Sequence, residues 1–137
     1  MEEIMKPDIA RVNLENIALQ MTSSLDLNEV LTTISQGLVD QLGADFARIW
    51  LLGPGDLCEE CFKASSCRNQ EKCLHLKASA GRYTNLSGEY RRVPLGEAPI
   101  GRIATEKEPI FSEDLINDNQ FPNKEWIKAN ELCCYAG

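Results

Sequence analysis

The feature that most constrains this chain is a polar stretch with four cysteines within sixteen residues. They are Cys58, Cys61, Cys67 and Cys73, in the spacing C-x2-C-x5-C-x5-C. The stretch from residue 53 to residue 72 has too few large apolar side chains to bury a core of its own, and long structureless loops are uncommon in compact domains. Four thiolates on one metal ion would supply the folding energy that the stretch lacks.

The sequence also indicates the cellular compartment. Its first residues lack the basic and apolar segments of a secretory signal, and no apolar run approaches the roughly 18 residues of a membrane helix. We therefore expect a cytoplasmic protein, in which structural disulfides are disfavoured. The 137 residues include 14 basic and 21 acidic side chains, for a net charge of −7. This balance disfavours nucleic acid and anionic membranes as partners.

Four interpretations of the loop cysteines stay open. A structural zinc site fits the number of ligands, since zinc requires only a tetrahedral arrangement. An iron–sulfur cluster also takes four thiolates, although the common ferredoxin spacing is absent. The third interpretation is a pair of disulfides, and the fourth is a set of thiols with no shared ligand. We favour zinc because of the compartment and the ligand count.

Other residues that could bind a metal or offset its charge have less specific interpretations. His75 follows Cys73 by two residues and could replace a cysteine as ligand, although a surface or hydrogen-bonded histidine is commoner. Cys133 and Cys134 are adjacent; strained geometry disfavours a disulfide between them, and we predict small buried side chains. Four basic residues could offset the charge of a thiolate centre, or are simply solvated: Lys63, Arg68, Lys72 and Lys77.

Apolar periodicity predicts alternating helices and short strands. Two amphipathic helices are expected first, over residues 8–24 and from the capping box of Asp26 and Glu29 to Gly43. A strand with both faces largely covered is expected over 46–52, and a strand with alternating burial over 73–81. Shorter elements follow: a strand at 91–95, a helix opening at 99–104, a strand at 110–111, a loop at 114–121 and a helix at 122–132.

The order of these segments resembles a GAF domain. The most specific part is PLGEAPIGRIA at residues 94–104; SLDLNEVLTTISQGLVDQLGADFARIWLL and LHLKASAG are similar to the family's opening segments. The likeness covers roughly residues 24–137. It implies an α+β fold with a central antiparallel sheet flanked by helices, of which the final strands would be missing after residue 137.

The resemblance also implies an organisation and a function. We expect an N-terminal helix over residues 1–25, for dimerisation or signalling, and a GAF-like domain over 26–137 with a cysteine-rich insert at 53–73. The family supplies sensory input modules of bacterial-type signal-transduction proteins. A homodimer is expected, joined in a longer parent chain to an output domain such as a kinase or a transcriptional regulator. A small-molecule ligand stays unidentified.

The sequence offers little support for catalysis. It has no phosphate loop, no dinucleotide glycine pattern and no arrangement of base and nucleophile, so we expect no catalytic residue. Two competing functions would use the same cysteines: a redox or gas sensor with an iron–sulfur cluster, and a thiol-based free methionine sulfoxide reductase. A pocket in the region of residues 82–108 could be lined by aromatic side chains, which are more often plain core: Trp50, Tyr83, Tyr90 and Phe111.

Overall fold

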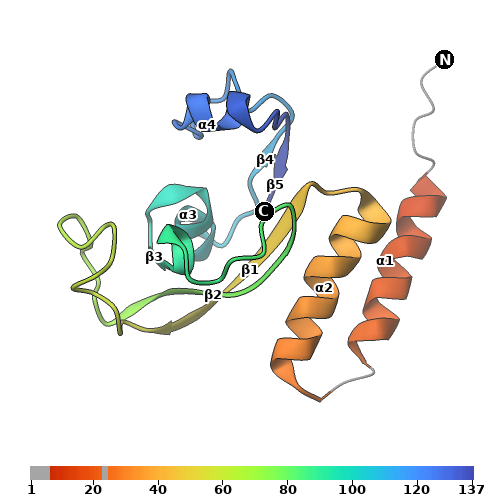
Figure 1. The fold of residues 1–137 in the computed structure, drawn as a ribbon, viewed down its shortest axis with the longest axis horizontal. Helices are drawn as coiled ribbons and strands as arrows, with labels where there is room; N and C mark the ends of the chain where they lie inside the picture. The colour runs from red at the N-terminus through yellow and green to blue at the C-terminus, as the bar shows by residue number, and fades with distance from the viewer. Residues whose placement is uncertain (1–6, 23–24) are drawn as a thin grey trace. The chain divides into compact units, whose positions relative to one another are not determined.

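The computed structural model of the chain describes residues 7–22 and 25–137 (Figure 1). Two compact units are formed, the first from residues up to Leu51 with His75–Arg91, and the second from Leu52–Leu74 with Arg92–Gly137. A three-stranded sheet has the order β1-β2-β3, and a two-stranded sheet pairs β4 with β5. The expected α+β class with an antiparallel sheet is confirmed. Among the described residues, no helix combines the length and the apolar character needed to cross a membrane.

The first unit contains the helices α1 (Pro7–Met21) and α2 (Leu27–Leu42), which lie side by side (Figure 1). The Asp26 carboxylate accepts a hydrogen bond from the Glu29 backbone N–H at 3.1 Å, so the predicted N-terminal cap of α2 is confirmed. The helix ends at Gly43, whose φ of 73° is the left-handed conformation that glycine adopts without a steric penalty.

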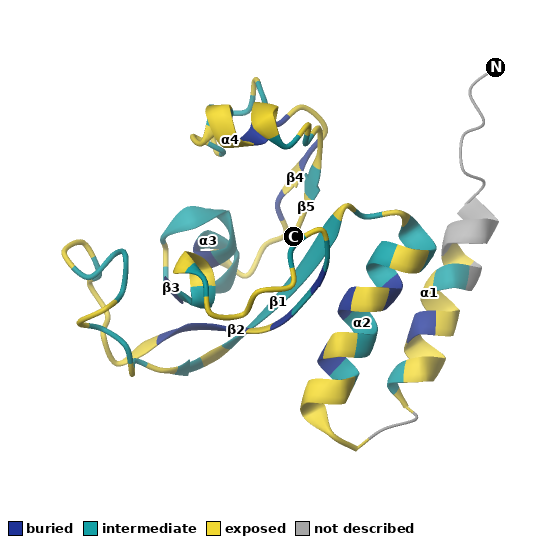
Figure 2. Cartoon of the chain, viewed as in Figure 1, coloured by how far each residue is buried: buried dark blue, intermediate teal, exposed yellow. Residues whose placement is uncertain are grey.

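The helices α1 and α2 pack closely at Gly37. A Cβ atom on Gly37 would come within 2.8 Å of Ile17 Cγ1, and Ile17 is buried. Asn13 Nδ2 also donates a hydrogen bond to the Gln41 carbonyl at 2.8 Å. Other apolar side chains of α1 are not covered, since Leu14 is 52% and Leu19 69% exposed (Figure 2).

The long strands β1 (Phe46–Pro54) and β2 (Lys72–Gly81) run antiparallel, with β2 in the centre of its sheet. The Arg82 N–H donates to the Asp45 carbonyl, and the Gly55 N–H donates to the Glu71 carbonyl, each at 2.9 Å. The predicted alternation is confirmed, since the inward positions Leu74, Leu76, Ala78 and Ala80 are all buried. His75 departs from it, because this position is buried as well. Both faces of β1 are partly covered over Phe46–Leu51, so the predicted cover is found there only in part, and none of the strand's residues is fully buried.

The second unit includes β3 (Arg92–Pro94) and α3 (Ala98–Glu106), and the 3-10 turn Glu89–Arg91 precedes β3. Val93 is fully buried, and the helix predicted near residues 99–104 is confirmed. A Cβ atom on Gly101 would lie 2.5 Å from the Pro94 carbonyl oxygen, so this position allows α3 to approach β3 closely. The PLGEAPIG motif therefore forms a strand end, a turn and a tightly packed helix.

The remaining elements of the second unit are β4 (Phe111–Ser112), α4 (Lys124–Ala129) and β5 (Tyr135–Ala136). Phe111 pairs with Ala136 and Ser112 with Tyr135 in an antiparallel ladder. The helix predicted over residues 122–132 is shorter than expected, because the chain leaves the helix after Ala129. Lys124 Nζ donates to the Leu115 carbonyl at 2.6 Å and to the Asp118 carbonyl, which holds the predicted loop in place.

Candidate metal site in the cysteine loop

The loop between β1 and β2 is folded by consecutive turns. The Ala64 N–H donates to the Cys61 carbonyl at 3.0 Å, and the Cys67 N–H donates to the Lys63 carbonyl at 2.8 Å. At the end of the loop, the Asn69 side-chain oxygen accepts from the backbone N–H groups of residues 71 and 72, at 3.0 and 3.2 Å. These bonds satisfy the backbone of a segment that has little apolar packing of its own.

The four predicted metal ligands line one cavity in the second unit. Cys58, Cys61 and Cys67 are half-buried and Cys73 is buried. The cavity has a volume of ≈ 20 Å³, and Leu57, Ala64 and Pro94 contribute to its lining. A space of this size holds about one water molecule or one ion. Side chains separated by up to fifteen positions in the sequence are therefore brought to a shared small space.

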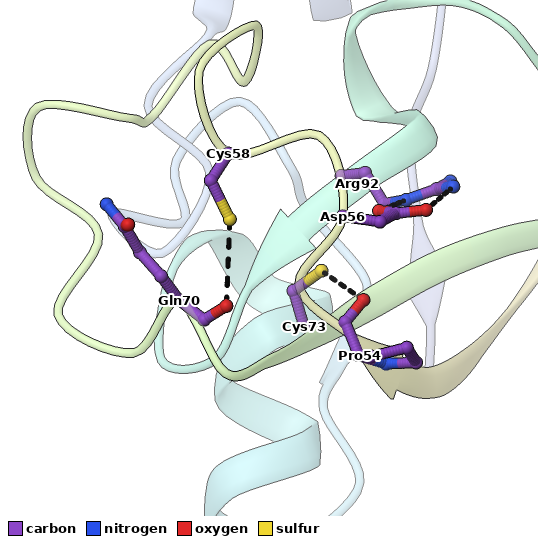
Figure 3. Close-up of polar contacts among 6 residues, drawn as sticks. All are labelled: Pro54, Asp56, Cys58, Gln70, Cys73 and Arg92. Atoms are coloured by element: carbon purple, nitrogen blue, oxygen red, sulfur yellow. Dashed lines mark hydrogen bonds and ion pairs between the residues drawn. The ribbon is translucent and has the colours of Figure 1, made fainter.

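Three of these thiols make contacts with backbone carbonyl groups, and Figure 3 shows those of Cys58 and Cys73. Cys58 Sγ lies 3.6 Å from the Gln70 oxygen, Cys67 Sγ 3.3 Å from the Asn69 oxygen, and Cys73 Sγ 4.0 Å from the Pro54 oxygen. A thiol is a weak hydrogen-bond donor, so these contacts are weak. A bound metal ion would replace the thiol protons, because the thiolate is the form that coordinates metals.

An ion pair at the edge of the cavity was not predicted from the sequence. Arg92, which lines the cavity, donates from Nε and Nη2 to the two carboxylate oxygens of Asp56, at 2.7 and 2.8 Å (Figure 3). This bidentate hydrogen bonding raises the pKa of Arg92. The two residues are 36 positions apart, so no local pattern could have paired them. Of the basic residues named from the sequence, Lys63 lies 3.7 Å from Glu97 instead.

Cys73 is electrostatically distinct. Burial raises the pKa of its thiol above the ordinary value, and the positive charge of Arg92 acts in the opposite direction. The thiol therefore holds its proton more firmly than an exposed cysteine does. Such a group is a weak nucleophile but becomes a strong ligand once a metal ion displaces the proton.

A closer set of metal-binding groups lies around the same cysteine. Asp56, Cys73 and His75 each offer a ligand atom within 4.8 Å of the other two, which is a possible metal-binding arrangement. His75 is buried rather than on the surface. The sulfur atoms of the other three loop cysteines are outside this close group.

Cys133 and Cys134 do not belong to the loop site. Both side chains are exposed, so the prediction that they are buried is wrong. They lie directly before β5, whose one partner among the described strands is β4, so this small sheet offers few side chains to cover them.

A wider cavity of ≈ 400 Å³ lies in the first unit. Tyr83 and Tyr90 line it together with Arg48 and Leu76, so two of the four aromatic residues considered from the sequence meet there. Trp50 is half-buried, and its indole N–H donates to the Tyr90 carbonyl at 2.9 Å. Phe111 is not a core residue, because it is 69% exposed.

Comparison with known protein families finds a match for this chain. The family model of the GAF domain matches residues 26–136, nearly the whole chain. No curated protein and no solved structure matches it. GAF domains are generally non-catalytic sensory modules and are often found in multidomain signalling proteins. With the fold and the extent of this match in agreement, the chain belongs to the GAF domain family.

Proposed function

We propose that this chain is a non-enzymatic sensory input domain in which the loop cysteines bind one structural zinc ion. In this proposal the domain works in the cytoplasm as a homodimer. It passes a signal to an output domain, a kinase or a transcriptional regulator, within a longer parent chain. The observation that carries the metal proposal is the position of Cys58, Cys61, Cys67 and Cys73 around a single cavity.

The size and the lining of the cavity support a metal ion. A space of ≈ 20 Å³ accommodates one ion but no organic ligand. Four thiolates complete the tetrahedral coordination of zinc, and structural zinc sites are closed in this way. The loop would have to rearrange for zinc, because of its four cysteines only Cys73 belongs to a close group of ligand atoms among the described residues. A segment held mainly by turns can make such a movement.

The charges beside the cavity act on a thiolate centre in opposite directions. Zinc with four thiolates has a formal charge of about −2. Arg92 at the cavity lowers the pKa of Cys73 and so favours its thiolate, whereas Asp56, with which Arg92 is paired, raises that pKa. The zinc would stabilise the loop, because its binding energy adds to the folding energy.

Zinc binding by the four loop cysteines is tested by metal analysis of protein purified without oxygen and passed through gel filtration. We expect one zinc per chain and no colour in the visible range. The Cys61→Ser variant is expected to lose that zinc, and Cys133→Ser, a matched change outside the loop, is expected to keep it.

Three different results would contradict the proposal. Iron with sulfide and visible absorbance would indicate an iron–sulfur sensor on the same cysteines. The absence of metal would leave thiols or disulfides in the loop. Thiol-dependent turnover of free methionine sulfoxide would contradict the non-enzymatic function; the raised pKa of Cys73 does not favour a nucleophile of that kind.

A further inference from the structure

Cys133 and Cys134 form an exposed pair of thiols directly before β5. Their sulfur atoms lie 3.8 Å apart. This is far beyond the disulfide bond length of about 2.05 Å, and closing a disulfide between neighbouring residues is strained. The arrangement presents two sulfur atoms on one side without joining them.

The separation of the two sulfur atoms corresponds to that of two ligands on one metal ion. Zinc binds thiolates at about 2.3 Å in a tetrahedral geometry, which places two sulfurs on the same ion about 3.8 Å apart. The observed distance of 3.8 Å equals this value. In the structure this distance is that of a hydrogen bond from the Cys133 thiol to the Cys134 sulfur, which a shared ion would replace at the same sulfur–sulfur separation.

Backbone hydrogen bonds fix the segment that carries the pair. The Leu115 N–H donates to the Cys133 carbonyl at 3.0 Å, and the Leu132 N–H donates to the Ile127 carbonyl at 3.1 Å. On the other side, Tyr135 pairs with Ser112 in the β4–β5 ladder. A segment held at both ends loses less conformational entropy when it binds a ligand.

We propose that Cys133 and Cys134 form a second metal site, a two-thiolate chelate for zinc or another thiophilic divalent cation. Each thiol releases its proton to solvent as its sulfur coordinates the ion. The two remaining positions of a tetrahedral ion are open to water or to a further ligand. Because the pair is exposed, its ion exchanges with solvent, unlike an ion enclosed in the loop cavity.

The second metal site is tested by equilibrium dialysis of the full chain against free Zn²⁺, with a phosphine reductant that keeps the thiols reduced. We expect the Cys133→Ser/Cys134→Ser double variant to bind one zinc fewer per chain than the wild type. Each single variant is expected to bind this ion at least about tenfold more weakly, because one thiolate cannot chelate. Circular dichroism checks that the variants are folded.

The same measurement separates this site from the loop site. If both exist, the wild type binds two zinc ions and the double variant binds one. If the loop binds no zinc, the wild type binds one and the double variant none, and the pair is still supported. A difference of less than half an equivalent between the two proteins overturns the proposal for Cys133 and Cys134, whatever the loop does.

Discussion

Ala98, at the start of α3, adopts a backbone conformation that is costly for its residue type. Its φ is 56°, in the left-handed region, two residues after Gly96 with a φ of 83°. A residue with a Cβ atom is destabilised by about 1–2 kcal/mol in this region, whereas glycine is not. In the turn of the PLGEAPIG motif, the left-handed conformation is therefore favourable at Gly96 but costs free energy at Ala98.

The Ala98→Gly substitution is expected to stabilise the protein by about 1 kcal/mol, since it removes this strain. Urea unfolding monitored by circular dichroism measures the change. Ala104→Gly is the matched control: it lies within the same helix, where glycine should cost about 0.5–1 kcal/mol. A loss of stability in both variants would show that the φ of Ala98 stores no strain.

The buried thiol of Cys73 predicts a pH dependence for the metal-free protein. Because burial raises its pKa in the folded state, the unfolded chain releases the proton first as pH rises. The free energy of unfolding should therefore be unaffected by this group below its ordinary pKa of 9.0 and fall above it. Tyr135, whose pKa burial also raises, acts in the same direction.

Comparison of the metal-free wild type with the Cys73→Ser variant separates the contribution of the Cys73 thiol to this pH dependence from that of Tyr135. Urea unfolding at about pH 8 and about pH 10.5 is expected to give a larger loss of stability in the wild type, because serine does not titrate in this range. Equal losses in the two proteins would mean that the Cys73 thiol does not contribute.

Among the elements, local signals predicted helices better than strands. The start and end of α2 depend on Asp26 and Gly43, whose side chain and backbone act within a few residues. The alternation along β2 was predicted, but the burial of His75 and the partial cover of β1 depend on which strand is central, and this is decided by β3, many residues later. The full extent of strand burial is therefore a property of the assembled sheet, which periodicity along one strand does not contain.

The contact between α3 and β3 depends on a glycine, and it gives a prediction for these two elements. Gly101→Ala would place a Cβ atom 2.5 Å from the Pro94 carbonyl oxygen, so the helix must move away from the strand. We expect a loss of about 1–3 kcal/mol in the free energy of unfolding, as for overpacked cores.

Gly88→Ala is the control for this prediction. The nearest atom to its added Cβ would be Asn85 Nδ2 at 3.7 Å, an ordinary contact, and the expected change is within about 0.5 kcal/mol. Thermal unfolding of the three proteins gives the comparison. A Gly101→Ala variant as stable as Gly88→Ala would mean that the close approach is not required.

At the scale of the whole molecule, the sequence predicted the family, and the four cysteines it singled out line one cavity, but it did not predict the residues around that cavity. The family depends on the order of segments and the PLGEAPIG motif, which are visible along the chain. Asp56 and Arg92 meet only because the chain returns through β3 beside the loop. The exposure of Cys133 and Cys134 likewise depends on the pairing of β5, not on the residues themselves.

Two exposed leucines of α1 give a prediction about assembly. Leu14 and Leu19 are 52% and 69% exposed in the single chain and lie about 140° apart around the helix, so a contact that covers both must enclose a broad part of α1. In the proposed homodimer, a second copy of the chain covers them. The Leu14→Glu/Leu19→Glu double variant should raise the dissociation constant of the dimer at least about tenfold, because buried carboxylates disfavour the contact.

Sedimentation velocity over a range of protein concentrations measures this change. Leu86→Glu is the control, because it adds a carboxylate at another exposed leucine, in the loop that precedes the turn Glu89–Arg91. The control should dimerise like the wild type, and circular dichroism should find all three proteins equally helical. A wild type that is monomeric, or a double variant that dimerises unchanged, would mean that α1 does not form the dimer contact, since the substitutions act only where these two side chains are covered.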